Sequence, residues 1–262
     1  MDEKEIIDLV KESPKVLEQV YQDLAQPSVR AVGQALGTVF EFSTSMLLPL
    51  KLLNEKFKLN FTRRLDEYRD KLMMIPEEKR CEVHPQIGTP IIEKLTYTTT
   101  DEIAELFTTL LAQASNVDRV NVAHPSFVGI IEHLSSDEAR VIKYLKRKER
   151  IQYCNFNGKR KSSEGYIILL SRLTMIPEEV KLDYPMNISV YLSNLESHGI
   201  IADRYGLWVV DKTETNKICK TYHLDRLRQD YVPSRFESID VERSYFEVTS
   251  FGKMFIDACV GM

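Results

Sequence analysis

Apolar side chains recur at helical spacing through the middle of this 262-residue chain. After Thr99 they fall three and four residues apart as far as residue 114, and Thr99 with Glu102 has the spacing of a capping box. A second stripe follows Pro125, a residue favoured at the first position of a helix. A third follows Ser135 and Glu138, which repeat the capping box. The pattern predicts three amphipathic helices joined by short turns.

The same block, residues 85–145, contains three distinctive sequence motifs: PQIGTPIIEKLTYT, then LLAQASN, then AHPSFVGIIEHLS. Its distinctive positions are Ile87, Gly88, Pro90, Ile91, Ile92, Glu93, Lys94, Leu95, Ala114, Ser115, Asn116, His124, Pro125, Ser126 and Phe127. These motifs resemble those of the abortive infection alpha family, bacterial proteins associated with defence against phage. The segments NLESHGII and YFEVTSFGKMFIDACV extend the resemblance more loosely towards the C-terminus. It implies a defence role, and it brings no reaction and no catalytic residue.

Two further helices are expected nearer the N-terminus. One covers about residues 14–24, with Ser13 as its cap and Pro14 at its first position. The other covers residues 54–75, where apolar residues from Phe57 to Ile75 alternate steps of three and four. That stripe suits packing against a helix of the same chain, or against a second copy in a homo-oligomer.

Between these helices lies an apolar segment, residues 31–50, whose only charged side chain is Glu41. A helix of that length would span about 30 Å, which is the thickness of a bilayer core. Gly33 and Gly37 have the GxxxG spacing that lets helices approach closely. The candidate positions for membrane insertion are Gly33, Gly37, Phe40, Leu47 and Leu48. A buried helix explains the same residues, because Glu41 and several hydroxyl side chains weaken the membrane signal.

The C-terminal half has a different pattern. It predicts helices near residues 165–174 and 185–198, strands at 207–210 and 245–249, and a closing helix at 251–260. Three helices followed by a two-stranded ribbon look like a winged helix. The predicted fold is therefore mainly α, with a helical domain at 1–134 and a winged-helix-like α+β domain with a small β-ribbon at 135–262. A charged insertion, residues 213–244, is a candidate surface for a protein partner.

The predicted third helix of this domain is poorly suited to reading DNA. Residues 186–200 include no Lys or Arg, and Glu196 would repel phosphate. The strongest basic region is instead a patch made of Lys143, Lys146, Arg147, Lys148, Arg150, Lys159, Arg160 and Lys161. The patch suits a solvated helix end, an anionic membrane surface or nucleic acid.

Charge and cysteine content narrow the class of protein. Residues 1–135 hold 15 basic against 21 acidic side chains and residues 136–262 hold 20 against 18, which is too mild for a dedicated nucleic-acid binder. Cys81, Cys154, Cys219 and Cys259 have no paired spacing, and the N-terminus does not resemble a signal peptide. We therefore expect a cytoplasmic protein, peripheral to the inner face of the membrane if the lipid interpretation holds.

No catalytic motif occurs in the sequence: there is no Walker A loop, GxGxxG, HExxH or GxSxG. His124 precedes the proline of a predicted helix and is expected to cap or pack rather than to act as a base. We expect no cofactor and no metal. The favoured prediction is a non-enzymatic abortive-infection effector or sensor, with an unidentified protein partner or phage trigger. The alternatives are a DNA-binding regulator that uses residues 143–161, and a subunit of a larger defence complex.

Overall fold

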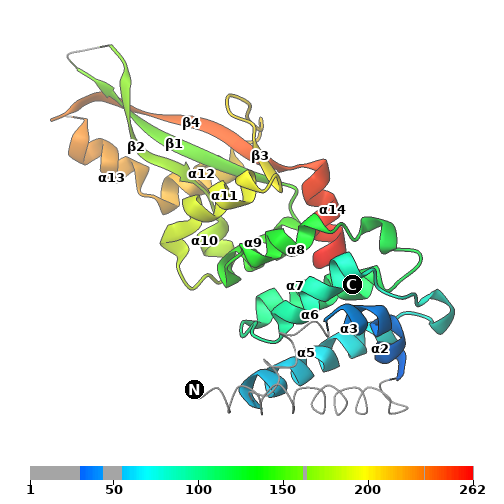
Figure 1. The fold of residues 1–262 in the computed structure, drawn as a ribbon. Helices are drawn as coiled ribbons and strands as arrows, with labels where there is room; N and C mark the ends of the chain where they lie inside the picture. The colour runs from blue at the N-terminus through cyan, green and yellow to red at the C-terminus, as the bar shows by residue number, and fades with distance from the viewer. Residues whose placement is uncertain (1–29, 44–54, 162–163, 233, 262) are drawn as a thin grey trace. The chain divides into compact units, whose positions relative to one another are not determined.

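A computed structural model describes residues 30–43, 55–161, 164–232 and 234–261 (Figure 1). The predicted helix at 14–24 lies outside these ranges. The chain divides into two compact units: unit 1 is Met1–Ala139 with Met254–Met262, and unit 2 is Arg140–Lys253. The predicted boundary after residue 134 lies close to this division, but residues 254–262 group with the first unit.

Unit 1 is helical and is arranged around one buried helix. Its longer helices are α5 (Glu55–Met73), α6 (Pro85–Leu95) and α7 (Asp101–Ala114), and the shorter ones are α2 (Arg30–Ala35), α3 (Gly37–Ser43) and α8 (Ser126–Glu132). Single turns of 3-10 helix occur at η1 (Glu77–Lys79) and η2 (Val120–Val122). Every residue from Leu106 to Ser115 is buried, because α5 and α6 both pack against α7. A helix that is apolar on most sides belongs in the interior of a helical domain.

The two predicted capping boxes have different outcomes. Ser135 and Glu138 form theirs: the Ser135 N–H donates to Glu138 Oε2 at 2.6 Å, and the Glu138 N–H donates to Ser135 Oγ at 3.3 Å. Helix α9 (Ser136–Leu145) therefore begins as predicted. The box at Thr99 is wrong in its cap residue, since Thr100 is the N-cap of α7. The Thr99 carbonyl instead accepts a hydrogen bond from Arg64.

The helix predicted at 54–75 is α5, and its apolar stripe is used within unit 1. Phe61, Leu65, Tyr68 and Leu72 are buried, and α5 packs mainly against α7. Tyr68 donates from its hydroxyl to Ser115 Oγ at 2.6 Å, because the Ser115 hydroxyl is itself donated to the Leu111 carbonyl. Most of the stripe thus packs against the same chain. A homo-oligomer contact through this helix stays a prediction.

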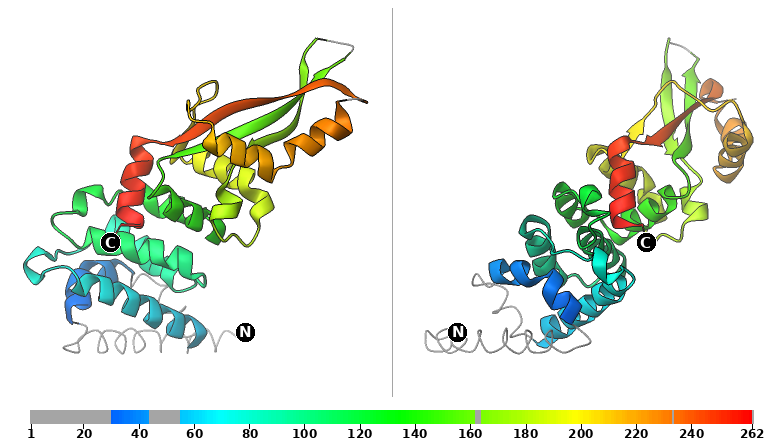
Figure 2. Two further views of the ribbon diagram at one scale, coloured as in Figure 1. Left: turned by 180° about the vertical axis from the view of Figure 1, so that it is seen from behind. Right: turned by 90° about the vertical axis from the view of Figure 1, so that its right-hand side faces the viewer.

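Unit 2 is built on a four-stranded antiparallel sheet of order β2-β1-β4-β3. The strands are β1 (Arg150–Arg160), β2 (Tyr166–Leu173), β3 (Ile201–Asp203) and β4 (Phe236–Val248). β1 and β4 run side by side over their length, from the pair Arg150 and Glu247 to the pair Arg160 and Phe236 (Figure 2). Its helices are α10 (Ile176–Glu179), α11 (Ile188–Ser197), α12 (Thr213–Thr221) and α13 (Leu224–Tyr231), with a 3-10 turn η3 (Pro185–Asn187). The closing helix α14 (Ser250–Cys259) begins in unit 2, and its residues from Met254 onward belong to unit 1.

One face of the sheet is covered by α12 and α13. Alternate residues of β1, Cys154 and Phe156, meet Ile218 of α12 and Leu224 of α13 in a buried cluster. Gly158 lies within β1. A Cβ atom there would come within 2.8 Å of the Phe236 ring, so a glycine lets this aromatic ring lie flat on the strand.

Several predictions for the C-terminal half are corrected. The helix predicted near 165–174 is wrong, because those residues form β2, an edge strand. The strand predicted at 207–210 is also wrong: the segment is a loop without strand pairing. The inserted segment is shorter than 213–244, because β4 begins at Phe236. The helices predicted at 185–198 and 251–260 are confirmed as α11 and α14. The winged helix is not confirmed, since a four-stranded sheet replaces its two-stranded ribbon.

Candidate functional site

The apolar segment at 31–50 is not one long helix. A turn at Leu36 separates α2 from α3, and the Glu82 carboxylate accepts hydrogen bonds from the N–H and hydroxyl of Thr38 in the first turn of α3. Those hydrogen bonds lower the pKa of Glu82. Phe40 is buried in unit 1. Within the described ranges, no helix has both the length and the apolar character needed to cross a bilayer.

The other candidate positions for membrane insertion give little support for the close helix packing that a GxxxG spacing allows. Among the described residues, a Cβ atom on Gly37 would meet only Glu82 Oε1, at an ordinary 3.6 Å, so no helix of the described ranges requires a glycine there. Gly33 lies in α2 and is partly buried. Leu47 and Leu48 lie outside the described residues.

The family-motif positions of α6 are explained by packing in unit 1. Ile87 and Gly88 are buried, and a Cβ atom on Gly88 would lie 2.3 Å from Val39 Cγ2, so α3 and α6 can approach only because this residue is glycine. Pro90 lies inside α6, on the same helix as Glu93. Lys94 pairs with Glu132 of α8 at 3.2 Å. These positions hold helices together.

The remaining motif positions act at helix ends. The side-chain Oδ1 of Asn116 accepts from the Asp118 N–H just after α7. His124 Nδ1 accepts from the Ser126 N–H at 3.2 Å, beside Pro125, the N-cap residue of α8. The prediction that His124 caps this helix is therefore supported by its geometry. Phe127 meets Phe255 of α14 edge to face, with ring centroids 5.1 Å apart.

The basic residues at 143–161 do not converge on one surface. Lys143 lies on α9, and Lys146, Arg147 and Lys148 follow in the turn after it. Arg150 and Arg160 stand at the two ends of β1, about 33 Å apart at the usual rise of an extended strand. The structure thus gives two separate basic clusters instead of one patch.

Acidic neighbours offset much of this basic charge. Lys148 pairs with Glu214 of α12 at 2.8 Å, Arg150 with Glu247 at 2.8 Å, and Lys159 with Glu237 at 3.1 Å. Lys161 also has an interacting partner. A surface that attracts phosphate backbones needs cations that are not already paired along its length. Each cluster contains at least one cation that is already paired with a carboxylate.

The structure points instead to a cleft between β4 and the helices α12 and α13. The cleft holds two adjoining cavities that share Arg228. The α12 hollow, of about 470 Å³, is lined by Lys212, Thr215, Asn216, Cys219, Leu224, Asp225, Arg228, Val241 and Arg243. The α13 hollow, of about 450 Å³, is lined by Arg228, Gln229, Val232, Glu237, Ser238, Ile239 and Asp240.

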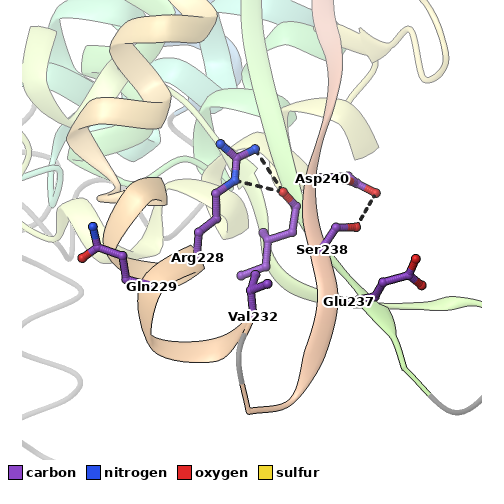
Figure 3. Close-up of a pocket in the computed structure, with 7 residues that line it drawn as sticks. Arg228, Gln229, Val232, Glu237, Ser238 and Asp240 are labelled. Atoms are coloured by element: carbon purple, nitrogen blue, oxygen red, sulfur yellow. Dashed lines mark hydrogen bonds between the residues drawn. The ribbon is translucent and has the colours of Figure 1, made fainter.

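The α13 hollow is mainly apolar and slightly acidic. Figure 3 shows Arg228 reaching from α13 to β4, where Nε and Nη2 donate to the Ile239 carbonyl at 3.2 and 3.1 Å. On β4, Ser238 donates to Asp240 at 3.3 Å. Two carboxylates, those of Glu237 and Asp240, stand against the single cation Arg228 in its lining. This cavity therefore offers no excess positive charge.

The α12 hollow has the opposite charge. Lys212, Arg228 and Arg243 face a single carboxylate, Asp225, which leaves a formal excess of two positive charges in its lining. Thr215 and Asn216 add polar side chains from α12. Three chain segments bring these groups together: Lys212 is the N-cap of α12, Arg228 lies on α13, and Arg243 lies on β4 opposite Cys154 of β1.

Arg243 is the least satisfied polar group of this hollow. Its Nη1 is buried and has no hydrogen-bond partner in the described structure. Its guanidinium lies 5.8 Å from the ring centre of Trp208, a cation–π contact. A buried guanidinium N–H without an acceptor is costly. The lining therefore includes an arginine with one N–H group that is unpaired within the described structure.

The thiols beside the hollow are poorly suited to act as nucleophiles. Burial raises the pKa of Cys219, and it raises the pKa of Cys154, which lies next to it in the core, to about 12. Both groups are therefore neutral thiols at pH 7. Among the described residues, no group of three or more His, Cys, Asp and Glu side chains is placed to hold a metal ion.

Sequence reasoning did not find this site. Lys212, Arg228 and Arg243 are spread over 31 positions, and no local spacing connects them. The predicted charged insertion at 213–244 contained two of the three, but only as a candidate partner surface. The α12–α13 turn and the pairing of β4 with β1 bring them together, and neither could be predicted from composition.

Comparison with known proteins bears on the family. A structure of an uncharacterized protein from the hydrocarbon-degrading marine bacterium Alcanivorax borkumensis SK2 matches 55% of this chain and 96% of its own, at 14% identity and a TM-score of 0.35, which is too low to support a statement about fold. No curated protein matched the chain. The family model described as abortive infection alpha matches residues 54–259, which include both the α6–α8 motif positions and the cleft. The chain therefore belongs to the abortive infection alpha family, and its role is related to abortive infection.

Proposed function

We propose that this protein is a non-enzymatic sensor in abortive infection, and that it responds to an anionic ligand bound in the α12 hollow. The observation that carries the proposal is the buried Nη1 of Arg243, which lacks a partner in a cavity with an excess of positive charge. The family supports the biological setting. The cationic lining of the hollow supports the binding of an anionic ligand.

An anion fits the hollow for electrostatic reasons. Arg243 and Lys212 can donate charge-assisted hydrogen bonds to phosphate or carboxylate oxygens, and these are stronger than bonds between neutral groups. A volume of about 470 Å³ lies within the range of small-molecule sites. Arg228 is already held by the Ile239 carbonyl, so it contributes a fixed charge. A ligand anion would neutralise the excess positive charge of the lining.

The lining of the hollow favours binding over catalysis. Among the described residues that line it, Asp225 is the only carboxylate and none is a histidine, and Cys219 is a neutral thiol. General acid–base or nucleophilic catalysis needs a poised base next to a second reactive group. The residues present can recognise charge, and they do not form such a pair.

DNA binding through residues 143–161 is the weaker alternative. It requires the basic side chains to follow one surface, whereas Arg150 and Arg160 stand at opposite ends of β1 and three of the cations are paired with carboxylates. Membership of a larger defence complex remains the alternative that predicts inactivity when the chain is expressed alone.

Phage challenge of cells that express the full chain tests the proposal. The test variant is Lys212→Gln with Arg243→Gln, which removes two charges from the hollow. The matched control is Lys217→Gln with Arg226→Gln, which removes two charges from the exposed surfaces of α12 and α13. We expect protection at low multiplicity and culture collapse at high multiplicity for the wild type and the control, and loss of both for the hollow variant.

Two results would count against the proposal. If the hollow variant protects as well as the control at equal protein levels, the α12 hollow is not the sensing site. If the wild-type chain alone gives no protection, the larger-complex alternative gains and the chain is not a self-sufficient sensor.

A further inference from the structure

The loop between β3 and α12 exposes large apolar side chains. Leu207, Trp208 and Val210 are 56%, 57% and 87% exposed, on a turn whose Gly206 has φ +80°. This is the segment whose apolar content predicted a strand, yet it pairs with no strand. Adjacent exposed apolar side chains of this size commonly mark a contact surface.

This loop adjoins the α12 hollow. The Trp208 ring lies against the Arg243 guanidinium, and the loop ends at Lys212, so cations flank the apolar tip. The acidic residue between them, Asp211, is engaged with α12: its carboxylate accepts from the N–H and hydroxyl of Thr213 at 2.9 and 2.7 Å. The hydrogen bonds keep Asp211 ionised, so the surface combines exposed apolar groups with two cations, Lys212 and Arg243, and one carboxylate.

We propose that this loop and the α12 hollow dock the protein on the surface of an anionic phospholipid bilayer. A lipid phosphate is the anion of the hollow, and Leu207, Trp208 and Val210 enter the interfacial layer of the bilayer. The inference rests on the proposed function, since it names the ligand of the same site. The contact is peripheral and involves no membrane-spanning segment.

The chemistry favours a lipid surface over a free phosphate compound. A free anion would satisfy Arg243 but would leave Leu207 and Val210 in water. A bilayer presents phosphate and hydrocarbon next to each other, and tryptophan partitions to that boundary. Stable peripheral attachment takes two signals, and here they are an apolar insertion and a cationic site.

The chain offers a direct probe, because Trp208 is its only tryptophan. The full-length protein is mixed with vesicles of phosphatidylcholine alone or with phosphatidylglycerol added. We expect a blue shift of the tryptophan emission and co-sedimentation only with the anionic vesicles. Both should weaken as salt is raised, because surface charge attraction is screened.

Two substitutions, each with a matched control, locate the contact. Val210→Asp places a charge at the loop tip and keeps the probe, and Met186→Asp changes an equally exposed residue on η3. Arg243→Gln removes a hollow cation, and Arg226→Gln removes an exposed one from α13. We expect Val210→Asp to abolish the blue shift, Arg243→Gln to weaken co-sedimentation about fivefold, and the two controls to bind like the wild type.

Two outcomes overturn lipid docking and separate it from the proposed function. If anionic vesicles give no shift while pyrophosphate changes the Trp208 emission saturably, the hollow takes a soluble anion: the sensor proposal stands and the lipid inference fails. If Val210→Asp binds vesicles as well as Met186→Asp does, the loop is not the docking surface. A failure to respond to vesicles and to pyrophosphate alike overturns both proposals.

Discussion

Two arginines, one fully buried and one partly buried, distinguish the two units. In unit 1, Arg64 is fully buried: Nη1 donates to Glu67 at 2.6 Å, Nη2 donates to Asp101 at 2.8 Å, and only Nε lacks a partner. In unit 2, the buried Nη1 of Arg243 has no acceptor, and its charge rests against Trp208. Unit 1 neutralises its buried charge within the fold, whereas Arg243 in unit 2 has an N–H group without an acceptor. We propose that the first arrangement stabilises the fold and that the second binds a ligand.

The largest expected effect on stability is at Arg64. Replacing it with Ala removes the link between α5 and the start of α7 and leaves a cavity in unit 1. We expect a loss of about 2–3 kcal/mol, below the 3–5 typical of a broken buried pair because both carboxylates reach solvent. Urea unfolding measures it. The control is Arg63→Ala, which removes a half-exposed side chain of the same helix and should cost under about 1 kcal/mol.

The next effect tests the family motif as packing. Gly88→Ala places a Cβ atom 2.3 Å from Val39 Cγ2, and valine has little rotamer freedom to yield. We expect a destabilisation of about 1–3 kcal/mol from overpacking. Adding Val39→Ala should restore part of it, and Gly37→Ala, with its nearest contact at 3.6 Å, should not show the same clash. Equal losses for Gly88→Ala and Gly37→Ala would mean that the motif glycine does not serve the α3–α6 contact.

A smaller effect should appear with pH. The hydrogen bond and charge of Arg64 lower the pKa of Asp101, and aspartate in an unfolded chain titrates near 4. The stabilisation from Asp101 is therefore present above about pH 4 and is lost as pH falls through the lower folded-state pKa. Asp101→Asn should flatten the stability profile in that acid range. An unchanged profile would show that the pair with Arg64 contributes nothing to acid unfolding.

The smallest change in stability is expected in the cleft. Arg243→Gln removes a charge that has no acceptor for Nη1, so the free energy of unfolding should change by less than about 1 kcal/mol. A loss as large as that of Arg64→Ala would show that Arg243 is a structural residue. The comparison between the two units would then fail.

The helices predicted correctly share one property, which is a long amphipathic repeat. Helices α7, α9, α11 and α14 each bury a stripe at helical spacing, and that stripe is visible in the sequence. The segment around β2, YIILLSRL, is a short apolar run, and such a run does not distinguish a helix from a strand. The apolar run at 207–210 predicted a strand, but the segment is a loop whose apolar residues are exposed.

The candidate site could not be predicted from sequence patterns, because its residues come from segments that are distant in the sequence. The GxxxG spacing of Gly33 and Gly37 and the basic run at 143–161 are local signals, and the fold separates α2 from α3 and the two ends of β1. The α12 hollow depends on contacts between segments that are distant in sequence. Only the pairing of β4 with β1 and the packing of α12 and α13 on that sheet bring Lys212, Arg228 and Arg243 into one cavity.

The measurement that tests this account most directly is a titration of the full-length protein with pyrophosphate, followed by the emission of Trp208. The account predicts a saturable change for the wild type, and an affinity about tenfold weaker for Arg243→Gln, which loses a charged hydrogen bond. Arg226→Gln should titrate like the wild type. A response that does not saturate, or one that is the same in Arg243→Gln, would contradict an anion site in the α12 hollow.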